Sequence, residues 1–296
     1  MVRILVTAFV ALVGLSFGSF LNVCLSRWPE GESILRPRSH CWSCNRTLAW
    51  WENVPLLSWI ALGGRCRTCK VWIGWRYPLV ELAVGSVWAV IGWQLVGEFQ
   101  DTQSAIAPIS FSLGFGILDA LGMMLLSWML VGLAALDAEH FWLADAVTLP
   151  GVALGIAYFA WLNELVAPAS AFTTVFWMNI AKRLLVSGAA ALLILLIRWL
   201  YKLIRHREGI GVGDAKLMAM LAAWLGLEGA LLSFFLGVVL GTIVAIIVLA
   251  MPSQRADGKS LALKKLPLGT FLCIGGIVSS LCGQTIIAAY VRWAGF

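Results

Sequence analysis

The sequence predicts an all-α polytopic membrane protein with about eight transmembrane helices and a small cytoplasmic four-cysteine domain after the first helix. Of its 296 residues, 61% are hydrophobic and only 12% are charged, and the mean hydropathy is +0.90. A soluble domain cannot bury that much apolar surface, so lipid must be the main solvent. The charged residues also gather in a few loops between long apolar runs.

Eight apolar runs approach the roughly 20 residues that a helix needs to cross the hydrocarbon layer. The clearest are residues 4–26, 229–254 and 266–291, and the shorter ones are 79–97, 113–136, 143–162, 180–204 and 214–228. The first run follows Arg3 as a signal peptide would, but it is long and lacks small residues at the cleavage spacing. We therefore expect it to be retained as a helix.

The basic residues predict the orientation of these helices. Eight lysines and arginines lie from Arg27 to Arg76, four from Arg198 to Arg207 and four from Arg255 to Lys265. If odd-numbered helices run inward, these loops share one face, which the positive-inside rule makes cytoplasmic. The net charge of +6 is then a signal of topology. It gives no reason to expect nucleic-acid binding.

The one long polar insertion, residues 27–78, contains two Cys-x-x-Cys pairs, Cys41 with Cys44 and Cys66 with Cys69. Two such pairs 21 residues apart are typical of a zinc ribbon, in which each pair supplies two thiolates from one tight turn. Two disulfides are the alternative, but a cytosolic loop would be kept reduced. Four thiolates leave zinc no open position, so the metal would be structural.

Seven of the 16 tryptophans lie in this insertion. Because indole prefers the headgroup layer, the insertion is expected to lie against the bilayer surface. Packing of the tryptophans in a small core around the zinc is an alternative, and both can hold at once.

Two acidic segments are predicted to enter the membrane from the cytoplasmic face. Asp214 follows the glycines of Gly209–Gly213 at the start of the sixth helix, and Asp137 ends the third helix. Asp214 taken alone is also a common helix cap. Carboxylates at membrane depth cost roughly 2.5–3.5 kcal/mol even on the lenient insertion scales, so both should face protein or water and could meet.

Other polar residues near these segments are weaker candidates. Asp145 opens the fourth helix, where it has a capping role available. Asp119 lies about 27 Å of helical rise before Asp137, at the opposite membrane face. No metal-ligand set surrounds His140, and Lys216 points to another helix face than Asp214, so its role stays open.

A pair of carboxylates that shares one proton can activate water against a peptide bond. The ionised member takes a proton from water while the neutral member donates to the carbonyl oxygen. A glycine-flanked helix start also offers backbone partners to an extended substrate. Asp137 and Asp214 are therefore predicted to be the catalytic pair of an aspartic peptidase.

Several segments resemble bacterial prepilin peptidases, also called type IV leader peptidases, over most of the chain. They are GSFLNVCLSRWP at 18–29, the two cysteine pairs, ENVPLLSWIALGGRC at 52–66, WRYPLVELAVG at 75–85, DAEHFWLADAVTLP at 137–150 and GVGDAKLMAMLAAWLG at 211–226. The resemblance implies three parts: a first transmembrane helix (1–26), a zinc-binding domain contributing to methyl transfer (27–78) and a membrane peptidase domain (79–296).

The resemblance also implies a function. Such enzymes sit in the inner membrane and remove the basic leader of type IV prepilins and type II secretion pseudopilins at the cytoplasmic face, and many then methylate the new N-terminal Phe with S-adenosylmethionine. The family's catalytic aspartates match Asp137 and Asp214, and residues matching other family positions are Asn22, Glu52, Arg76 and Glu81. Where the family usually has Pro-Asp, this chain has Ala144-Asp145, which removes no ionisable group.

Three alternatives stay open on the sequence alone. A peptidase without methyl transfer would keep the zinc-held insertion. A proton-coupled transporter would place its aspartates at mid-membrane in internally repeated bundles, and no clear repeat is visible. An assembly factor would use the insertion to bind a partner and would not need the aspartates.

Overall fold

The computed structural model describes residues 1–102, 109–166, 172–206, 211–250 and 266–295. The chain forms two compact units, Met1–Gly132 and Leu133–Phe296. The boundary falls inside helix α4, Ile109–His140. The division into 1–26, 27–78 and 79–296 concerns roles and stays a prediction. The predicted basic loop from Arg255 to Lys265, together with Arg207, Gly209 and Ile210, lies outside the described residues.

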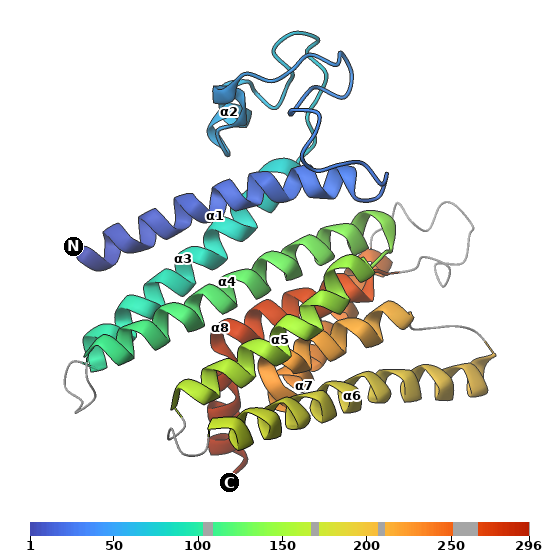
Figure 1. Cartoon of the computed structure of the whole chain (residues 1–296). Helices are drawn as coiled ribbons and strands as arrows, with labels where there is room; N and C mark the ends of the chain where they lie inside the picture. Colours follow the sequence, from blue (N-terminus) through green and yellow to red (C-terminus); the bar gives the residue numbers. More distant parts are fainter. Residues whose placement is uncertain (103–108, 167–171, 207–210, 251–265, 296) are drawn as a thin grey trace. The chain divides into compact units, whose positions relative to one another are not determined.

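The first unit is built on two long helices, α1 (Val2–Arg27) and α3 (Arg76–Thr102), which are coloured blue and cyan in Figure 1. Small residues let their backbones approach closely, as is common between membrane helices. A Cβ on Gly18 would lie 2.7 Å from the Cα of Glu81, and one on Gly85 would lie 2.6 Å from the Leu15 side chain. Phe17 packs on Trp88 with ring centroids 5.0 Å apart.

Between α1 and α3 lies the predicted cysteine domain, with a short 3₁₀ helix η1 (Trp50–Asn53) and a short helix α2 (Leu57–Ala61). Arg27 ties its start to the end of α1, because its guanidinium donates to the carbonyl oxygens of Ser33 at 2.8 Å and Pro37 at 2.7 Å.

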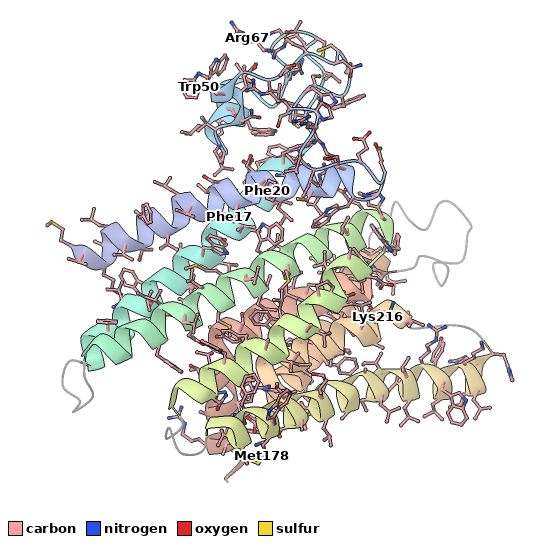
Figure 2. All side chains as sticks on the ribbon, viewed as in Figure 1. Phe17, Phe20, Trp50, Arg67, Met178 and Lys216 are labelled. Atoms are coloured by element: carbon pink, nitrogen blue, oxygen red, sulfur yellow. The ribbon has the colours of Figure 1, made fainter. Side chains whose placement is uncertain are left out.

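The tryptophans of this domain include a packed cluster and exposed side chains, and the expected contact with the bilayer surface stays a prediction. Trp59, Trp72 and Trp75 pack on one another. Trp50, labelled in Figure 2, and Trp42 are exposed.

The second unit contains the end of α4 and four further helices. They are α5 (Asp145–Val166), α6 (Phe172–Arg205), α7 (Val212–Ala250) and α8 (Leu268–Ala294). Much of the outer surface is apolar, as lipid-facing helices require. Met178, labelled in Figure 2, and Leu185 are exposed on α6 at 61% and 73%. Seven helices of the described residues are long and apolar enough to cross a membrane.

Helix α7 explains why about eight spans were expected and seven continuous helices are found. Its 39 residues would extend about 58 Å as a straight helix, roughly twice the hydrocarbon thickness. The run is broken at Gly226, whose φ of 75° and ψ of −177° are not helical. The two predicted spans 214–228 and 229–254 are the two arms that this glycine joins.

The packing partners of the two arms show that α7 reverses direction at Gly226. The first arm runs parallel to α5: Lys216 pairs with Asp145, and the Trp224 indole donates to the Gly151 carbonyl at 2.8 Å. The second arm runs antiparallel to α8, because Gly229 contacts Ser279 while Gly241 contacts Phe271.

Helices α5 and α8 start at the same end of this unit. The Leu143 side chain, just before α5, touches both Gly213 at the start of α7 and Gly269 at the start of α8. The first arm of α7 therefore leads away from this end and the second arm returns to it (Figure 1).

A basic residue from α6 holds the turn between the arms. The carbonyl of Ala222 lies in the last turn of the first arm, four residues before Gly226. The Arg183 guanidinium donates to this carbonyl at 3.1 Å and lies 3.4 Å over the Phe159 ring. A cation at a helix C-terminus is favourable, and the ring shields it from lipid.

Candidate active site and candidate metal centre

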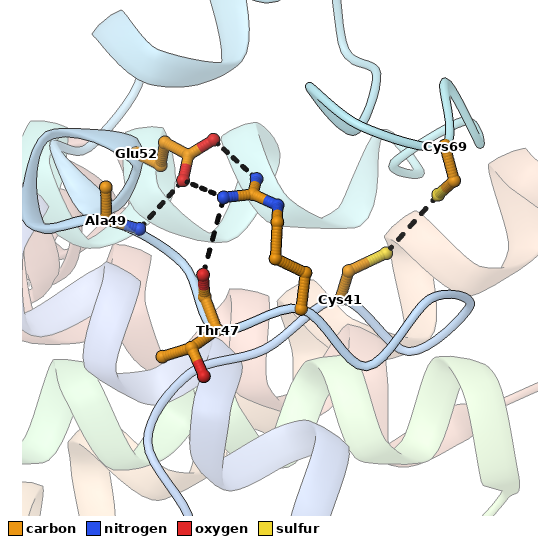
Figure 3. Close-up of polar contacts among 6 residues, drawn as sticks. Cys41, Thr47, Ala49, Glu52 and Cys69 are labelled. Carbon is orange, nitrogen blue, oxygen red and sulfur yellow. Dashed lines mark hydrogen bonds and ion pairs between the residues drawn. The ribbon is translucent and has the colours of Figure 1, made fainter.

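The four predicted zinc ligands meet in the first unit. The thiol sulfurs of Cys41, Cys44, Cys66 and Cys69 all lie within 4.8 Å of one another. The Sγ atoms of Cys41 and Cys69 are 3.7 Å apart, as Figure 3 shows. Tetrahedral zinc with bonds of about 2.3 Å to sulfur places its sulfurs about 3.8 Å apart, whereas a disulfide requires about 2.05 Å. The cluster thus fits a four-thiolate metal ion.

The two cysteine turns have the same backbone geometry. In the first, the backbone N–H of Cys41 donates to the Arg46 carbonyl at 2.9 Å, and Asn45 takes a positive φ of 53°. In the second, the backbone N–H of Cys66 donates to the Val71 carbonyl at 2.9 Å, and Lys70 takes a φ of 58°. N–H groups of Cys69 and Thr68 hold the pKa of the Cys66 thiol at about 6, so a thiolate is available there near neutral pH.

The Glu52 carboxylate is held by hydrogen bonds within this domain. Arg46 binds its carboxylate in two hydrogen bonds of 2.9 and 2.7 Å, and the Ala49 N–H adds a third of 2.7 Å (Figure 3). The Arg46 guanidinium is the main reason that the pKa of Glu52 lies below its ordinary value. Glu52 therefore closes the loop after the first cysteine turn.

The three other residues that match family positions lie where α1, α3 and the cysteine domain join. The Asn22 amide donates to the Tyr77 carbonyl at 3.0 Å, and Arg76 donates to the Ser26 hydroxyl at 2.7 Å. The buried Glu81 accepts the Leu56 N–H at 2.8 Å, at the start of α2. Among the described residues, the Oδ1 atom of Asn22 is buried without a hydrogen-bond partner.

In the second unit, Asp137 lies in the last turn of α4 and is 6% exposed. Its Oδ2 atom accepts the Thr270 N–H at 2.6 Å and lies 3.1 Å from the Thr270 hydroxyl. A Cβ on Gly269 would stand 2.9 Å from the same oxygen. A glycine is needed there because any side chain would push the carboxylate away from α8.

Asp214 lies in the first turn of α7 and is 7% exposed. Its Oδ2 atom accepts the N–H of Gly211 at 3.0 Å, and a Cβ on Gly211 would approach the same oxygen. Asp214 is therefore not the N-cap itself but the third residue of the helix, and its side chain caps the N–H of the preceding Gly211. This contact occupies one of the two carboxylate oxygens.

The structure brings the two predicted aspartates to the same place. Leu143 touches the glycines next to each of them, Gly213 and Gly269. The two carboxylates interact electrostatically with each other, and both act on the buried thiol of Cys273 in α8. Within the described residues, no lysine or arginine forms an ion pair with either aspartate. The site is a pair of buried carboxylates at adjoining helix ends.

The competing acidic residues lie elsewhere. Asp145 is exposed and receives both of its short contacts, 2.7 Å each, from the ammonium of Lys216. The sequence left the role of Lys216 open. The structure shows that Lys216, labelled in Figure 2, links α7 to α5 through its ion pair with Asp145. His140 and Glu139 are exposed at the end of α4, 3.8 Å apart. Asp119 belongs to the part of α4 in the first unit.

The contribution of α8 was missed by sequence reasoning. Residues 266–291 were predicted as a span, but nothing in that prediction placed Gly269 and Thr270 against Asp137. The available signal was Pro267 followed closely by Gly269, which marks a helix start that another backbone can approach. No local pattern indicates that this helix start faces the end of α4.

Two family descriptions match the chain. Residues 12–95 match the Bacterial Peptidase A24 N-terminal domain, and residues 124–246 match the Type IV leader peptidase family. The chain belongs to the type IV leader peptidase family. The predicted resemblance is thus confirmed, and this membrane protein is a peptidase.

Curated relatives match over nearly the whole chain. A Prepilin leader peptidase/N-methyltransferase of Pseudomonas aeruginosa is 32% identical, and one of Stutzerimonas stutzeri is 30% identical; each match covers 96% of this chain and 93% of the relative. A relative of the same name in Burkholderia pseudomallei is 33% identical over 93% of this chain and 85% of its own length. No solved structure matches the chain.

Proposed function

We propose that this protein cleaves the leader of type IV prepilins and type II secretion pseudopilins by activating water between Asp137 and Asp214. The observation that supports this most is the meeting of two buried carboxylates from distant segments, with no basic partner among the described residues. An ion pair with a lysine or arginine would keep a carboxylate in its charged form. Two carboxylates without such a partner can share one proton. A proton carrier would place its aspartates at mid-membrane, but these two lie at helix ends.

In the proposed reaction, one aspartate takes a proton from water as the oxygen attacks the scissile carbonyl carbon. The other donates its proton to the carbonyl oxygen. The resulting diol then collapses: its C–N bond breaks, the nitrogen takes up the first proton and the second aspartate recovers its own. Each carboxylate has one oxygen, Oδ1, without a hydrogen bond from the described residues, so each can reach a substrate or water.

The charge pattern supports an inner-membrane location with the site toward the cytoplasm. Basic loops on one face obey the positive-inside rule under the predicted topology. A leader that carries Lys or Arg would stay in the cytosol while its apolar segment enters the bilayer. The scissile bond would then reach the membrane boundary, where we place both aspartates.

We infer that Cys41, Cys44, Cys66 and Cys69 hold a structural zinc ion, which would stabilise the fold of the insertion. We also infer methylation of the new N-terminal Phe, for which S-adenosylmethionine would supply an electrophilic methyl group. Asn22 and Glu81 fit a role near this donor, because Asn22 has a free buried oxygen and Glu81 a buried carboxylate. Glu52 fits less well, because Arg46 and Ala49 occupy it.

The test is incubation of the purified full-length protein with a synthetic leader-bearing prepilin peptide, with and without S-adenosylmethionine, read by mass spectrometry. Asp137→Asn and Asp214→Asn should each lower cleavage by at least about a thousandfold, because neither asparagine can exchange the proton. Asp145→Asn is the matched control and should retain cleavage. Full processing by Asp137→Asn or Asp214→Asn would reject the assignment. An unchanged product mass with the donor present would reject methylation.

A further inference from the structure

The two aspartates differ in the hydrogen bonds that they accept. Asp137 has two donor groups on a single oxygen, the N–H of Thr270 at 2.6 Å and the Thr270 hydroxyl at 3.1 Å. Asp214 has one donor, the N–H of Gly211 at 3.0 Å. Asp214 lies in the first turn of α7, where the helix dipole favours its anion. Oδ2 of Asp137 faces the start of α8, which favours its anion, but Asp137 itself lies in the last turn of α4, where the dipole of that helix disfavours it. The number and length of the bonds distinguish them.

Hydrogen bonds to a carboxylate favour its charged form, and bonds to charged groups are stronger than neutral ones. An oxygen that accepts two donors also has little room for a proton of its own. The Thr270 contacts therefore favour the ionised form of Asp137 over that of Asp214. They also leave Oδ1 of Asp137 as the free oxygen of an anion.

Other ionisable groups around Asp137 do not reverse this preference. Asp214 faces it from α7 and Cys273 from α8, and both are more easily kept neutral beside an anion. Glu139 and His140, which follow Asp137 in α4, are exposed. Asp145 on α5 is neutralised by Lys216 from α7.

We propose that Thr270 is the positioning residue that makes Asp137 the general base and leaves the shared proton on Asp214. This deepens the proposed function and rests on it. Oδ1 of Asp137 takes the proton of the attacking water as the new C–O bond forms, and Asp214 protonates the carbonyl oxygen as its π bond breaks. When the C–N bond breaks, Asp137 gives its proton to the nitrogen and the diol returns one to Asp214.

The Thr270 hydroxyl can follow this cycle, because it has a second acceptor. Its oxygen lies 3.1 Å from the Ala134 carbonyl and 3.1 Å from Oδ2 of Asp137, and its single hydrogen can serve only one of them at a time. It donates to Asp137 while that carboxylate is charged. Once Asp137 holds a proton, the hydroxyl can turn to Ala134 at no loss of hydrogen bonding.

The test is the pH dependence of kcat/KM for leader cleavage by the full-length protein. Thr270→Val keeps the N–H and the branched shape but removes the hydroxyl, so the charged form of Asp137 loses one donor. The acidic limb of the profile should move to higher pH by about one to two units, as the loss of a hydrogen bond to a charged group implies. Activity near the optimum should fall less than activity on the acidic side.

Two controls separate positioning from structure. Thr270→Ser keeps the hydroxyl and should restore the acidic limb of the unmodified protein. Thr242→Val removes a hydroxyl that donates to the Val238 carbonyl elsewhere in α7, and its profile should be unchanged. A Thr270→Val enzyme that loses activity equally at every pH, or whose acidic limb stays in place, would overturn the proposal.

The two Asp→Asn variants keep this inference separate from the proposed function. If Asp137→Asn or Asp214→Asn still cleaves the leader, the peptidase pair itself is wrongly assigned. If both are inactive while Thr270→Val follows the unmodified profile, the pair stands and only the division of roles fails.

Discussion

The four-cysteine centre and the aspartate pair are both clusters of ionisable groups, yet they are completed in different ways. The cysteine sulfurs all lie within 4.8 Å, and a metal ion would use every one of them. Nearby, Glu52 is likewise saturated by Arg46 and Ala49. Asp137 and Asp214 instead keep one oxygen each without a partner from the described residues. A closed centre stabilises a fold, whereas an open centre retains capacity for chemistry.

The largest expected effect breaks the closed centre. Cys66→Ser should abolish the proposed zinc binding and unfold the region around residues 39–72, because a structural zinc site contributes about 10–16 kcal/mol to folding. Zinc content by emission spectroscopy and proteolysis of this region measure the two outcomes. Cys282→Ser, at an exposed thiol of α8, is the control. A metal-free protein with an intact, protease-resistant insertion would contradict the structural role.

In the second unit, which contains the aspartate pair, the turn at Gly226 should be the backbone position most sensitive to substitution. Gly226→Ala places a side chain at a φ of 75° and 2.9 Å from the Arg183 guanidinium. Such a conformation costs about 1–3 kcal/mol for a non-glycine residue. Unfolding in detergent should show this loss. Gly188→Ala, which meets no atom within 4 Å, should be nearly neutral. Equal effects of the two would mean that the arms of α7 do not depend on this turn.

Replacing a carboxylate by an amide should have opposite effects at the two centres. Glu52→Gln should weaken the cysteine domain because Arg46 loses its charged partner. Asp137→Asn should leave stability unchanged or raise it, because it removes a buried charge that no base among the described residues balances. Thermal unfolding of both variants measures the difference. A stability loss in Asp137→Asn as large as that in Glu52→Gln would make the aspartate pair a structural feature.

The pH dependence of the stability of the cysteine domain should reveal the contribution of Glu52. Its pKa is lower in the folded protein than in the unfolded chain. The stabilisation is therefore complete above the unfolded value, near 4.3, and is lost as pH falls through the lower folded value. Proteolysis of the insertion between about pH 6 and pH 3 should show this loss. The Glu52→Gln protein should lack this acid-dependent step.

The smallest effect is expected at the ion pair beside the open centre. Lys216→Met should cost less than about 1 kcal/mol, because the Asp145 pair is exposed and screened by water and salt. Unfolding at low and high salt measures it. A loss of several kcal/mol, or cleavage abolished by this change, would show that the pair belongs to the reaction centre.

Much of the fold and the clustering of the four cysteines could be predicted from the sequence, whereas the catalytic roles of Asp137 and Asp214 stay a prediction. The apolar runs predicted the helices, and the spacing of Cys41, Cys44, Cys66 and Cys69 predicted their cluster, because four ligands from two tight turns meet under local constraints. The merging of 214–228 and 229–254 into α7 could not be predicted. Hydropathy does not detect a reversal that a single glycine makes inside an apolar run, because no polar residue marks the turn. The contact register of its two arms restores the count of eight segments.

The sequence by itself determined that this chain lies in lipid, that four cysteines form one centre, and that Asp137 and Asp214 are costly enough at membrane depth to need a function. Composition and local spacing carry that information. Only the tertiary structure decided that Thr270 and Gly269 complete the site, that Lys216 neutralises Asp145 and that Arg183 holds the turn of α7. These contacts join helices that lie far apart in the chain, and their register depends on packing that no local pattern records.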